Sequence, residues 1–234
     1  MVERTENYDV VVVGAGNAAA CAALAAADQG AKVLVLERAP KSEAGGNTRF
    51  TAGAIRFAYN GVEDLKSLMP DLTGSEIEMT DFGVYSEDDF YEDMGRVTNY
   101  RTDPELANTL VSESYATVSW MQTKGVRFAP IWGRQAFKLD GKFKFWGGLT
   151  VEAWGGGEGL HEAFISAFKS NNIDLVYGTS AKKLLTDDKG VRGVQVKNNG
   201  ITSEIFADSV VLASGGFQAN TEWRTRYLGP GWDL

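Results

Sequence analysis

Residues 8–37 constrain the fold of this chain more than any other segment. An apolar run at 10–13 predicts a strand that is buried on both faces. The run leads directly into the turn Gly14–Ala19, which has the pattern G-x-G-x-x-A, and then into an alanine-rich helix expected at 18–29. A second apolar strand follows at 32–36. This order of strand, glycine turn, helix and strand predicts the first βαβ unit of a dinucleotide-binding domain.

The small residues of the turn each have a physical reason. Gly14 allows the tight connection between strand and helix, and Gly16 leaves room for a pyrophosphate to approach the backbone. Ala19 replaces the usual third glycine and is still small enough for the helix to lie against the strand. The helix N-terminus offers N–H groups and a partial positive charge to phosphates. Glu37, about twenty residues on, can accept hydrogen bonds from ribose hydroxyls. Its charge argues against NADP but does not separate NAD from FAD.

Composition and charge narrow the class of protein. The chain has 234 residues, 44% of them hydrophobic, which suffices for one large domain or two small ones. Its net charge of −8 speaks against binding nucleic acid or an anionic membrane surface, although a local basic pocket could still bind an acidic substrate. No apolar run is long enough to span a membrane. The N-terminus has no apolar signal region, so the protein is expected to be cytoplasmic.

The rest of the chain shows weaker patterns. Residues 38–85 have little regularity, and 128–154 are expected to form short strands and loops. Helices are predicted from the Ser86 cap to Asn99, from the Asp103 cap to Gly125, at 160–170 and at 221–228. Strands are predicted at 175–177, 181–186, 191–197, 201–207 and 209–213, with a tight hairpin at 198–200.

Five motifs together carry a resemblance to a known family. They are V-V-G-A-G-N-A-A-A-C-A-A (12–23), L-E-R-A-P (36–40), G-G-N-T (45–48), G-G-G-E-G-L (155–160) and L-A-S-G-G-F (212–217). With them, the sequence resembles the flavoproteins of the fumarate reductase/succinate dehydrogenase superfamily, and Asn17 favours the tricarballylate-dehydrogenase-like branch. The resemblance implies an α/β fold, namely a Rossmann-like FAD-binding domain with a β-meander and a helical or irregular excursion at 58–154.

The resemblance also implies which residues contact FAD. They are Gly14, Ala15, Gly16, Asn17 and Ala18 at the pyrophosphate; Glu37 and Arg38 at the adenosine ribose; Gly45, Gly46, Asn47 and Thr48 along the flavin and pyrophosphate; Ala52 and Gly53 near the isoalloxazine; backbone at Ala181 facing the adenine; and Ala213, Ser214 and Gly215 close to the cofactor. Some relatives bond FAD covalently to a histidine near the 45–48 loop. That loop has no histidine here, so FAD is expected to be noncovalent.

The implied function is an FAD-dependent dehydrogenase or reductase that acts on a C–C bond beside a carboxylate, with hydride transfer to or from flavin N5. Tricarballylate, succinate and fumarate are the substrate types implied, and an enone-forming ketosteroid-type reaction is the alternative. In such proteins a capping domain and a C-terminal segment of the FAD domain lie beyond position 234. Residues 1–234 are therefore expected to be the N-terminal part of an FAD-binding domain. They could also be a non-catalytic FAD-binding fragment that needs a second chain.

Several other polar and aromatic residues allow both a functional and a structural interpretation. Arg134, Lys138, Lys142 and Lys144 could form a basic wall for an anionic substrate or a solvated face. Trp146 and Trp154 could stack on a flavin, but packing in a core or interface is favoured. His161, the one histidine, is expected to be exposed or to cap a helix rather than to act as a base. No metal site is predicted, and the catalytic residues, the electron carrier and the direction of reaction stay open.

Overall fold

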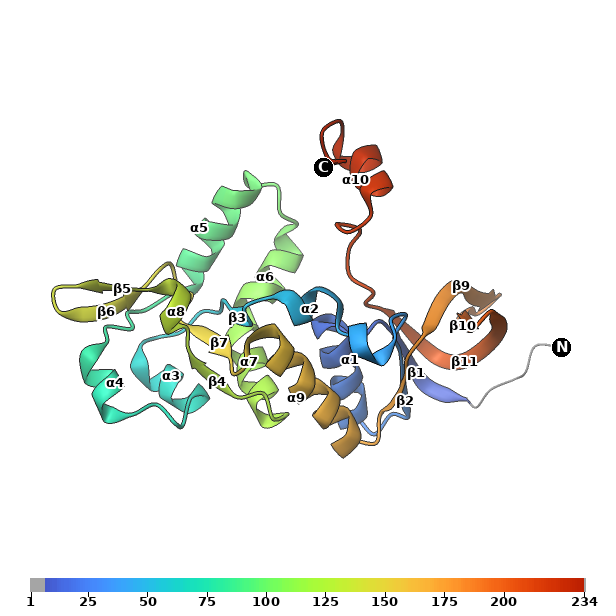
Figure 1. The fold of residues 1–234 in the computed structure, drawn as a ribbon, viewed down its shortest axis with the longest axis horizontal. Helices are drawn as coiled ribbons and strands as arrows, with labels where there is room; N and C mark the ends of the chain where they lie inside the picture. Colours follow the sequence, from blue (N-terminus) through green and yellow to red (C-terminus); the bar gives the residue numbers. More distant parts are fainter. Residues whose placement is uncertain (1–6, 234) are drawn as a thin grey trace. The chain divides into compact units, whose positions relative to one another are not determined.

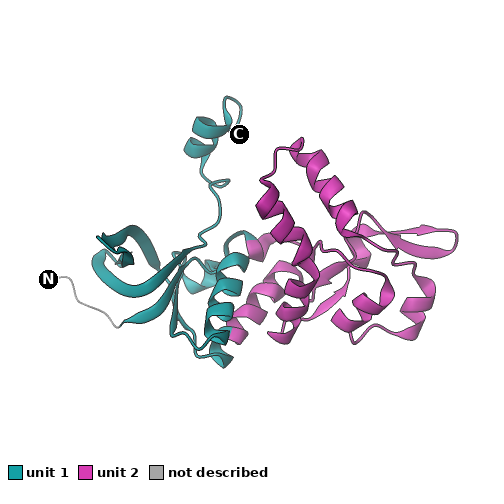
Figure 2. Cartoon of the chain, turned by 180° about the vertical axis from the view of Figure 1, so that it is seen from behind, with its two compact units in different colours: residues 1–47, 168–234 teal, residues 48–167 magenta. Residues whose placement is uncertain are grey.

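A computed structural model describes residues 7–233 of the chain, which divides into two units. Unit 1 comprises residues 1–47 and 168–234, and unit 2 comprises residues 48–167 (Figure 2). Residues 1–6, on which the expectation about a signal region partly rests, lie outside the described residues, as does residue 234.

Unit 1 is built on one six-stranded sheet with the order β8-β2-β1-β11-β10-β9 (Figure 1). The strands β8, β2, β1 and β11 pair in parallel, and β11, β10 and β9 form an antiparallel meander. The predicted combination of a Rossmann-like unit with a β-meander is confirmed. In chain order the bounds are β1 Tyr8–Val13, β2 Val33–Leu36, β8 Asp174–Val176, β9 Thr179–Asp187, β10 Gly190–Asn198 and β11 Ile201–Leu212.

Strand β11 belongs to both halves of this sheet. Its first residues pair antiparallel with β10, Ile201 opposite Asn198, and its last residues pair in parallel with β1, Leu212 opposite Val13. The prediction of two separate strands at 201–207 and 209–213 was therefore wrong. Asp208, the position between the two predicted strands, is exposed and stays within the strand. One strand thus couples the meander to the dinucleotide-binding half.

The core of unit 1 explains the apolar runs of β1 and β2. On one face, Val11 and Leu34 pack in a buried cluster with side chains of the meander such as Val194 and Ile205. Helix α1 (Asn17–Asp28) contacts β1 and β2, and its buried residues are alanines and Leu24. Because both sets of alternating side chains in β1 and β2 include fully buried valines and leucines, the predicted burial on both faces is confirmed.

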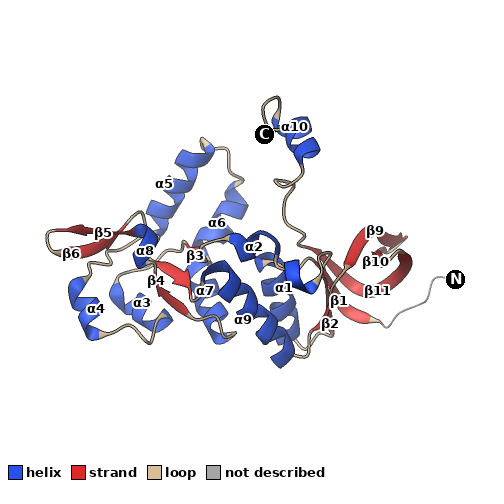
Figure 3. Cartoon of the chain, viewed as in Figure 1, coloured by secondary structure: helices blue, strands red, loops and turns tan. Residues whose placement is uncertain are grey.

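Unit 2 is mainly helical and carries two small sheets (Figure 3). A three-stranded sheet has the order β3-β7-β4, and β5 pairs with β6 in a hairpin. The bounds are α2 Gly46–Phe50, which starts in unit 1, β3 Ala54–Ile55, α3 Val62–Leu68, α4 Gly74–Met79, α5 Glu87–Thr98, α6 Pro104–Ser112, α7 Ser114–Thr123, β4 Phe128–Pro130, α8 Trp132–Gln135, β5 Ala136–Leu139, β6 Lys142–Phe145, β7 Val151–Ala153 and α9 Gly156–Ser170, which ends in unit 1.

Several helix predictions are confirmed at their N-termini and corrected elsewhere. Ser86 caps α5, and Asp103 caps α6 with Pro104 in its first turn. The single helix expected up to Gly125 is instead broken into α6 and α7 at Glu113, whose φ of −92° and ψ of 0° leave the helical region. Residues 38–85, expected to have little regularity, contain the short helices α2, α3 and α4. In unit 1, a 3₁₀ turn (Lys41–Glu43) precedes α2, and α10 (Thr221–Leu228) matches the predicted helix.

Among residues 7–233, no helix has both the length and the apolar character that crossing a membrane requires.

Candidate cofactor-binding site

The glycine turn of unit 1 is shaped by the segment that follows β11. Gly14 has a φ of +109°, in the left-handed region that favours glycine. A Cβ built on Gly14 would lie 2.4 Å from the carbonyl oxygen of Ala213 and 3.1 Å from the Cα of Ser214. The Ala213 N–H donates to the Val13 carbonyl at 2.9 Å, which holds this segment against the turn. Gly14 is therefore required both by the turn and by the close approach of Ala213 and Ser214.

The N-terminus of α1 is open to a phosphate group. Gly16 is its N-cap residue, with an extended backbone and no side chain to cap the helix. The first turn of α1 contains no acidic residue, and the first intrahelical bond runs from the Ala20 N–H to the Gly16 carbonyl at 2.9 Å. A helix N-terminus without a capping carboxylate leaves backbone N–H groups and a partial positive charge for an anionic ligand.

Glu37 lies directly beside this turn. Its carboxylate accepts a hydrogen bond from the Ala15 N–H at 3.1 Å and another from the Ala39 N–H at 2.8 Å. The phenol of Tyr177, which follows β8, has a pKa above its ordinary value, chiefly because it is partly buried and also because of the negative charge of Glu37. The two backbone donors fix the carboxylate at the end of β2, within reach of the glycine turn. Sequence reasoning did not identify Tyr177 as a neighbour of this carboxylate.

Most of the predicted FAD residues of unit 1 gather at one edge of the sheet. Because β1, β2, β8 and β11 are parallel, the residues that follow them meet at their carboxyl ends, where ligands bind in open α/β sheets. Ala181 reaches the same region, since the Thr179 N–H, two residues earlier in β9, donates to the Glu37 carbonyl at 2.9 Å. The residues brought together are Gly14, Ala15, Gly16, Asn17, Ala18, Glu37, Arg38, Ala181, Ala213, Ser214 and Gly215.

The 45–48 loop has an unusual backbone at its start. Gly45 and Gly46 have φ values of +104° and +52°, which favour glycine, and α2 begins at Gly46. Gly46 and Asn47 are exposed, whereas Thr48, the first residue of unit 2, is buried. The beginning of α2 therefore depends on glycine at positions 45 and 46, where other residues would be strained.

In unit 2, the predicted residues Ala52 and Gly53 lie against the glycine run at the start of α9. Gly53 has a φ of +73°, and a Cβ on it would lie 2.7 Å from the carbonyl carbon of Gly156. A Cβ on Gly157 would lie 2.1 Å from the carbonyl oxygen of Thr48, and the Gly157 N–H donates to the Thr51 carbonyl at 3.0 Å. The start of α9 thus packs backbone to backbone on residues 48–53, which the sequence motif alone did not reveal.

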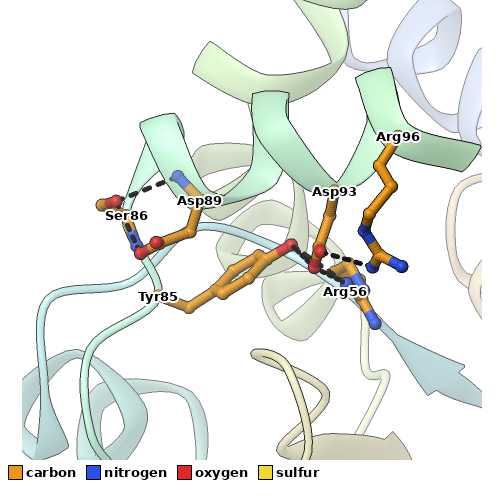
Figure 4. Close-up of polar contacts among 6 residues, drawn as sticks. All are labelled: Arg56, Tyr85, Ser86, Asp89, Asp93 and Arg96. Atoms are coloured by element: carbon orange, nitrogen blue, oxygen red, sulfur yellow. Dashed lines mark hydrogen bonds and ion pairs between the residues drawn. The ribbon is translucent and has the colours of Figure 1, made fainter. Parts of the chain in front are cut away.

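A charged network ties the segment after β3 to α5 in unit 2 (Figure 4). Arg56 donates from Nη1 to Asp93 at 2.6 Å and to the Tyr85 hydroxyl at 3.0 Å, and that hydroxyl donates to Asp93 at 2.9 Å. Arg96 also pairs with Asp93 at 2.9 Å. The pKa of Asp93 lies below its usual range. The largest cause is the hydrogen bond from Arg96, followed by the hydrogen bond from the Tyr85 hydroxyl and by the positive charge of Arg56. Its position next to β3 makes the network a structural support for the 48–55 segment.

Unit 2 also contains a cavity of about 430 Å³. Its wall is aromatic and acidic, with Phe82, Tyr85, Phe137, Asp89 and Glu92 among the lining residues. None of the predicted FAD residues lines it. The cavity and the dinucleotide-binding motif are therefore formed by different residues. We locate the cofactor from the motif and its backbone geometry and not from the cavity.

The structure corrects one expectation about a single side chain and narrows another. His161 is buried within α9 rather than exposed or capping a helix. Trp146 and Trp154 were expected to pack in a core or an interface; because 62% and 59% of their surfaces are exposed, the core is excluded, and packing in an interface stays a prediction. Trp146 stacks on Phe137 with ring centroids 4.3 Å apart, and the Arg127 guanidinium lies 4.4 Å from the Trp154 ring. Both rings are thus held by a neighbour at the surface.

The four basic residues considered as a substrate wall lie in and next to the β5–β6 hairpin. Arg134, Lys138 and Lys142 are exposed. Lys144 pairs with Asp81 at 3.0 Å. Lys144 also lines the cavity of about 430 Å³ described above, which none of the predicted FAD residues lines.

The sequence matches the family described as "FAD binding domain" over residues 9–232. It is similar to a fumarate reductase (cytochrome) of Shewanella frigidimarina, with 32% identity over 93% of this chain and 34% of the relative. It is also similar to a urocanate reductase of Eggerthella lenta, with 29% identity over 95% of this chain and 34% of the relative. The solved open conformation of a flavocytochrome c3 fumarate reductase superposes with a TM-score of 0.72 at 26% identity, covering 96% of this chain and 36% of that one.

The chain belongs to the FAD-binding flavoproteins of the fumarate reductase/succinate dehydrogenase superfamily, and its cofactor is FAD. It spans about a third of the length of these curated relatives. The geometry of unit 1 fits this cofactor on its own terms. The glycine turn and the uncapped start of α1 suit a pyrophosphate, and the Glu37 carboxylate beside them suits ribose hydroxyls.

Proposed function

We propose that this chain holds FAD for an oxidoreductase that acts on a C–C bond beside a carboxylate, either oxidising the single bond to C=C or reducing C=C to the single bond. The observation that carries the proposal is the convergence of the glycine turn, Glu37 and the Ala213–Gly215 segment at one edge of the sheet. The two relatives support the reaction class, since fumarate and urocanate both carry a C=C bond conjugated to a carboxylate. A tricarballylate-, succinate- or fumarate-like carboxylate is the proposed substrate.

The residues of the chain have distinct proposed roles. Backbone N–H groups at Gly14–Ala18 bind the pyrophosphate, and Glu37, with Arg38 beside it, binds the adenosine ribose. Backbone at Ala181 faces the adenine. The remaining contacts come from Gly45, Gly46, Asn47, Thr48, Ala213, Ser214 and Gly215 along the cofactor and from Ala52 and Gly53 near the isoalloxazine.

When bound, FAD supplies the hydride acceptor or donor for the substrate carbon. The proposed role of this chain is to bind the cofactor at the edge of the sheet and to orient it. Dehydrogenation also needs a proton acceptor and donors aimed at the substrate carboxylate. We assign neither to this chain, because its one histidine is buried in α9. The proposal therefore includes a further part of the protein, or a second chain, that supplies these groups and an electron carrier.

The purified protein is expected to carry FAD without a covalent bond. The reason is that residues 45–48 contain no histidine to which the flavin could be attached. The measurement is the visible absorbance of the native protein, followed by denaturation and removal of small molecules. We expect the flavin bands to leave with the small-molecule fraction. Colour that stays with the washed, denatured polypeptide would overturn the noncovalent linkage, and a colourless native protein that takes up no FAD would overturn the proposed function.

Replacing Glu37 by alanine is expected to weaken FAD binding. The change removes charge-assisted hydrogen bonds to the ribose, worth about 1.5–3 kcal/mol, and also leaves the Ala15 N–H without its acceptor. Glu37→Gln keeps one acceptor oxygen and should cost less. Affinity is measured by titrating FAD into the stripped protein. Equal affinities for wild type and Glu37→Ala would show that Glu37 does not contact the ribose.

A further inference from the structure

Glu152 is a carboxylate in the middle of the three-stranded sheet of unit 2. It lies on β7, directly opposite Ala54 of β3 and Ala129 of β4. Residues directly opposite in antiparallel strands share a face, so a small side chain flanks the carboxylate on each side. The neighbours of Glu152 in β7, Val151 and Ala153, are buried on the other face. Glu152 itself is half-buried on the open face of the sheet.

The carboxylate of Glu152 is not neutralised by its surroundings. Within the described range 7–233, no side chain or backbone group donates a hydrogen bond to it, and no cation lies within ion-pair distance. Burial raises its pKa above the ordinary value of a glutamate, and the positive charge of Arg134 on α8 offsets this only in part. A partly buried carboxylate without a hydrogen-bond donor responds to a change of charge nearby, because little else fixes its protonation state.

Glu152 is adjacent to the backbone of Gly53. The Ala153 N–H donates to the Gly53 carbonyl at 2.8 Å, and β3 begins at Ala54 opposite Glu152. The left-handed conformation of Gly53 and its contact with Gly156 fix this junction firmly. The residues assigned above to the isoalloxazine end of the cofactor, Ala52 and Gly53, therefore lead directly into the strand that pairs with β7 at Glu152.

We propose that Glu152 is a charge-tuning residue that lowers the reduction potential of the bound FAD. The inference rests on the proposed function, which places Ala52 and Gly53 beside the isoalloxazine. Two-electron reduction adds negative charge to the flavin unless protons are taken up. A nearby carboxylate opposes this charge, and more strongly at a half-buried site, where water screens less. By reciprocity, reduction of FAD favours protonation of Glu152, so electron uptake is coupled to proton uptake at its carboxylate.

The test is a redox titration of the FAD-loaded protein with dithionite and a reference dye. Glu152→Gln removes the charge while keeping the shape, and at pH 8 it should raise the midpoint potential. The expected change is about tenfold in the reduction equilibrium constant, or about 30 mV for a two-electron couple. The difference should shrink as the pH falls through the pKa of Glu152, because the wild-type carboxyl is then also neutral. The midpoint potential of Glu152→Asp should stay near that of the wild type. The same holds for Glu78→Gln, an exposed control in α4.

Each outcome bears on one of the two proposals. If FAD binds normally but Glu152→Gln has the wild-type potential at every pH, the tuning role is wrong and the proposed function stands. A shift of the same size at all pH values would indicate a change of shape rather than of charge, and would also overturn the tuning role. If the wild-type protein binds no FAD, the proposed function fails, and this inference fails with it.

Discussion

Replacing Gly16 by valine is expected to abolish FAD binding while unit 1 stays folded. Gly16 has a φ of −83° and a ψ of −172°, an extended backbone that any residue can adopt. The substitution therefore introduces no left-handed strain at this position. The branched Cβ would instead occupy the space in which a pyrophosphate approaches the start of α1. We expect a loss of at least about 2.7 kcal/mol of binding free energy, roughly a hundredfold in Kd.

The matched variant is Gly14→Val, which tests the other glycine of the same turn. Its φ of +109° and the 2.4 Å approach of the Ala213 carbonyl oxygen mean that a side chain strains the folded protein itself. Gly14→Val should thus lower the melting temperature and FAD binding together, whereas Gly16→Val should lower only FAD binding. Thermal unfolding of the FAD-free proteins measures the effect of each substitution on stability, and titration with FAD measures its effect on binding. A stable Gly16→Val protein with normal flavin content would contradict the proposed pyrophosphate contact.

The dinucleotide half could be predicted because its signal is local. The strand 8–13, the glycine turn, α1, β2 and Glu37 follow one another within thirty positions or so, and each is specified by its own residues. The edge where Glu37 meets the turn then follows from the parallel pairing of β1 and β2. The residues proposed to contact the cofactor at this edge could therefore be predicted from the sequence before their positions were known.

The parts that could not be predicted depend on contacts between distant residues. Strand β11 pairs with β10 and β1 at once, and no local pattern shows that Asp208 stays within one strand. The burial of His161 and the exposure of Trp146 depend on which face of each element meets a neighbour. Hydrophobicity predicts average burial, and tertiary packing decides it for a single side chain. The role of Glu152 was hidden for the same reason, since its environment is made by β3, β4 and α8.

The glycine run 155–159 is the clearest case in which the structure supplies a reason that the motif lacked. Its members lie where α9 starts, and Gly157 contacts the backbone of residues 48–51. A Cβ there would be 2.1 Å from the Thr48 carbonyl oxygen and 2.7 Å from that of Thr51. Both atoms belong to the backbone, so neither can move without displacing the loop that leads to Ala52 and Gly53.

Gly157→Ala is therefore expected to destabilise unit 2 and to weaken FAD binding in the same variant. Glycine to alanine within a helix normally stabilises by about 0.5–1 kcal/mol. Overpacking against fixed atoms costs about 1–3 kcal/mol, so the clash decides the sign. Gly74→Ala is the matched control, because Gly74 begins α4 and a Cβ there meets nothing within 4 Å. Chemical denaturation should show a lower free energy of unfolding for Gly157→Ala than for the wild type, and an unchanged one for Gly74→Ala. Equal stability and equal FAD affinity in the two variants would mean that the start of α9 does not support the 48–53 segment.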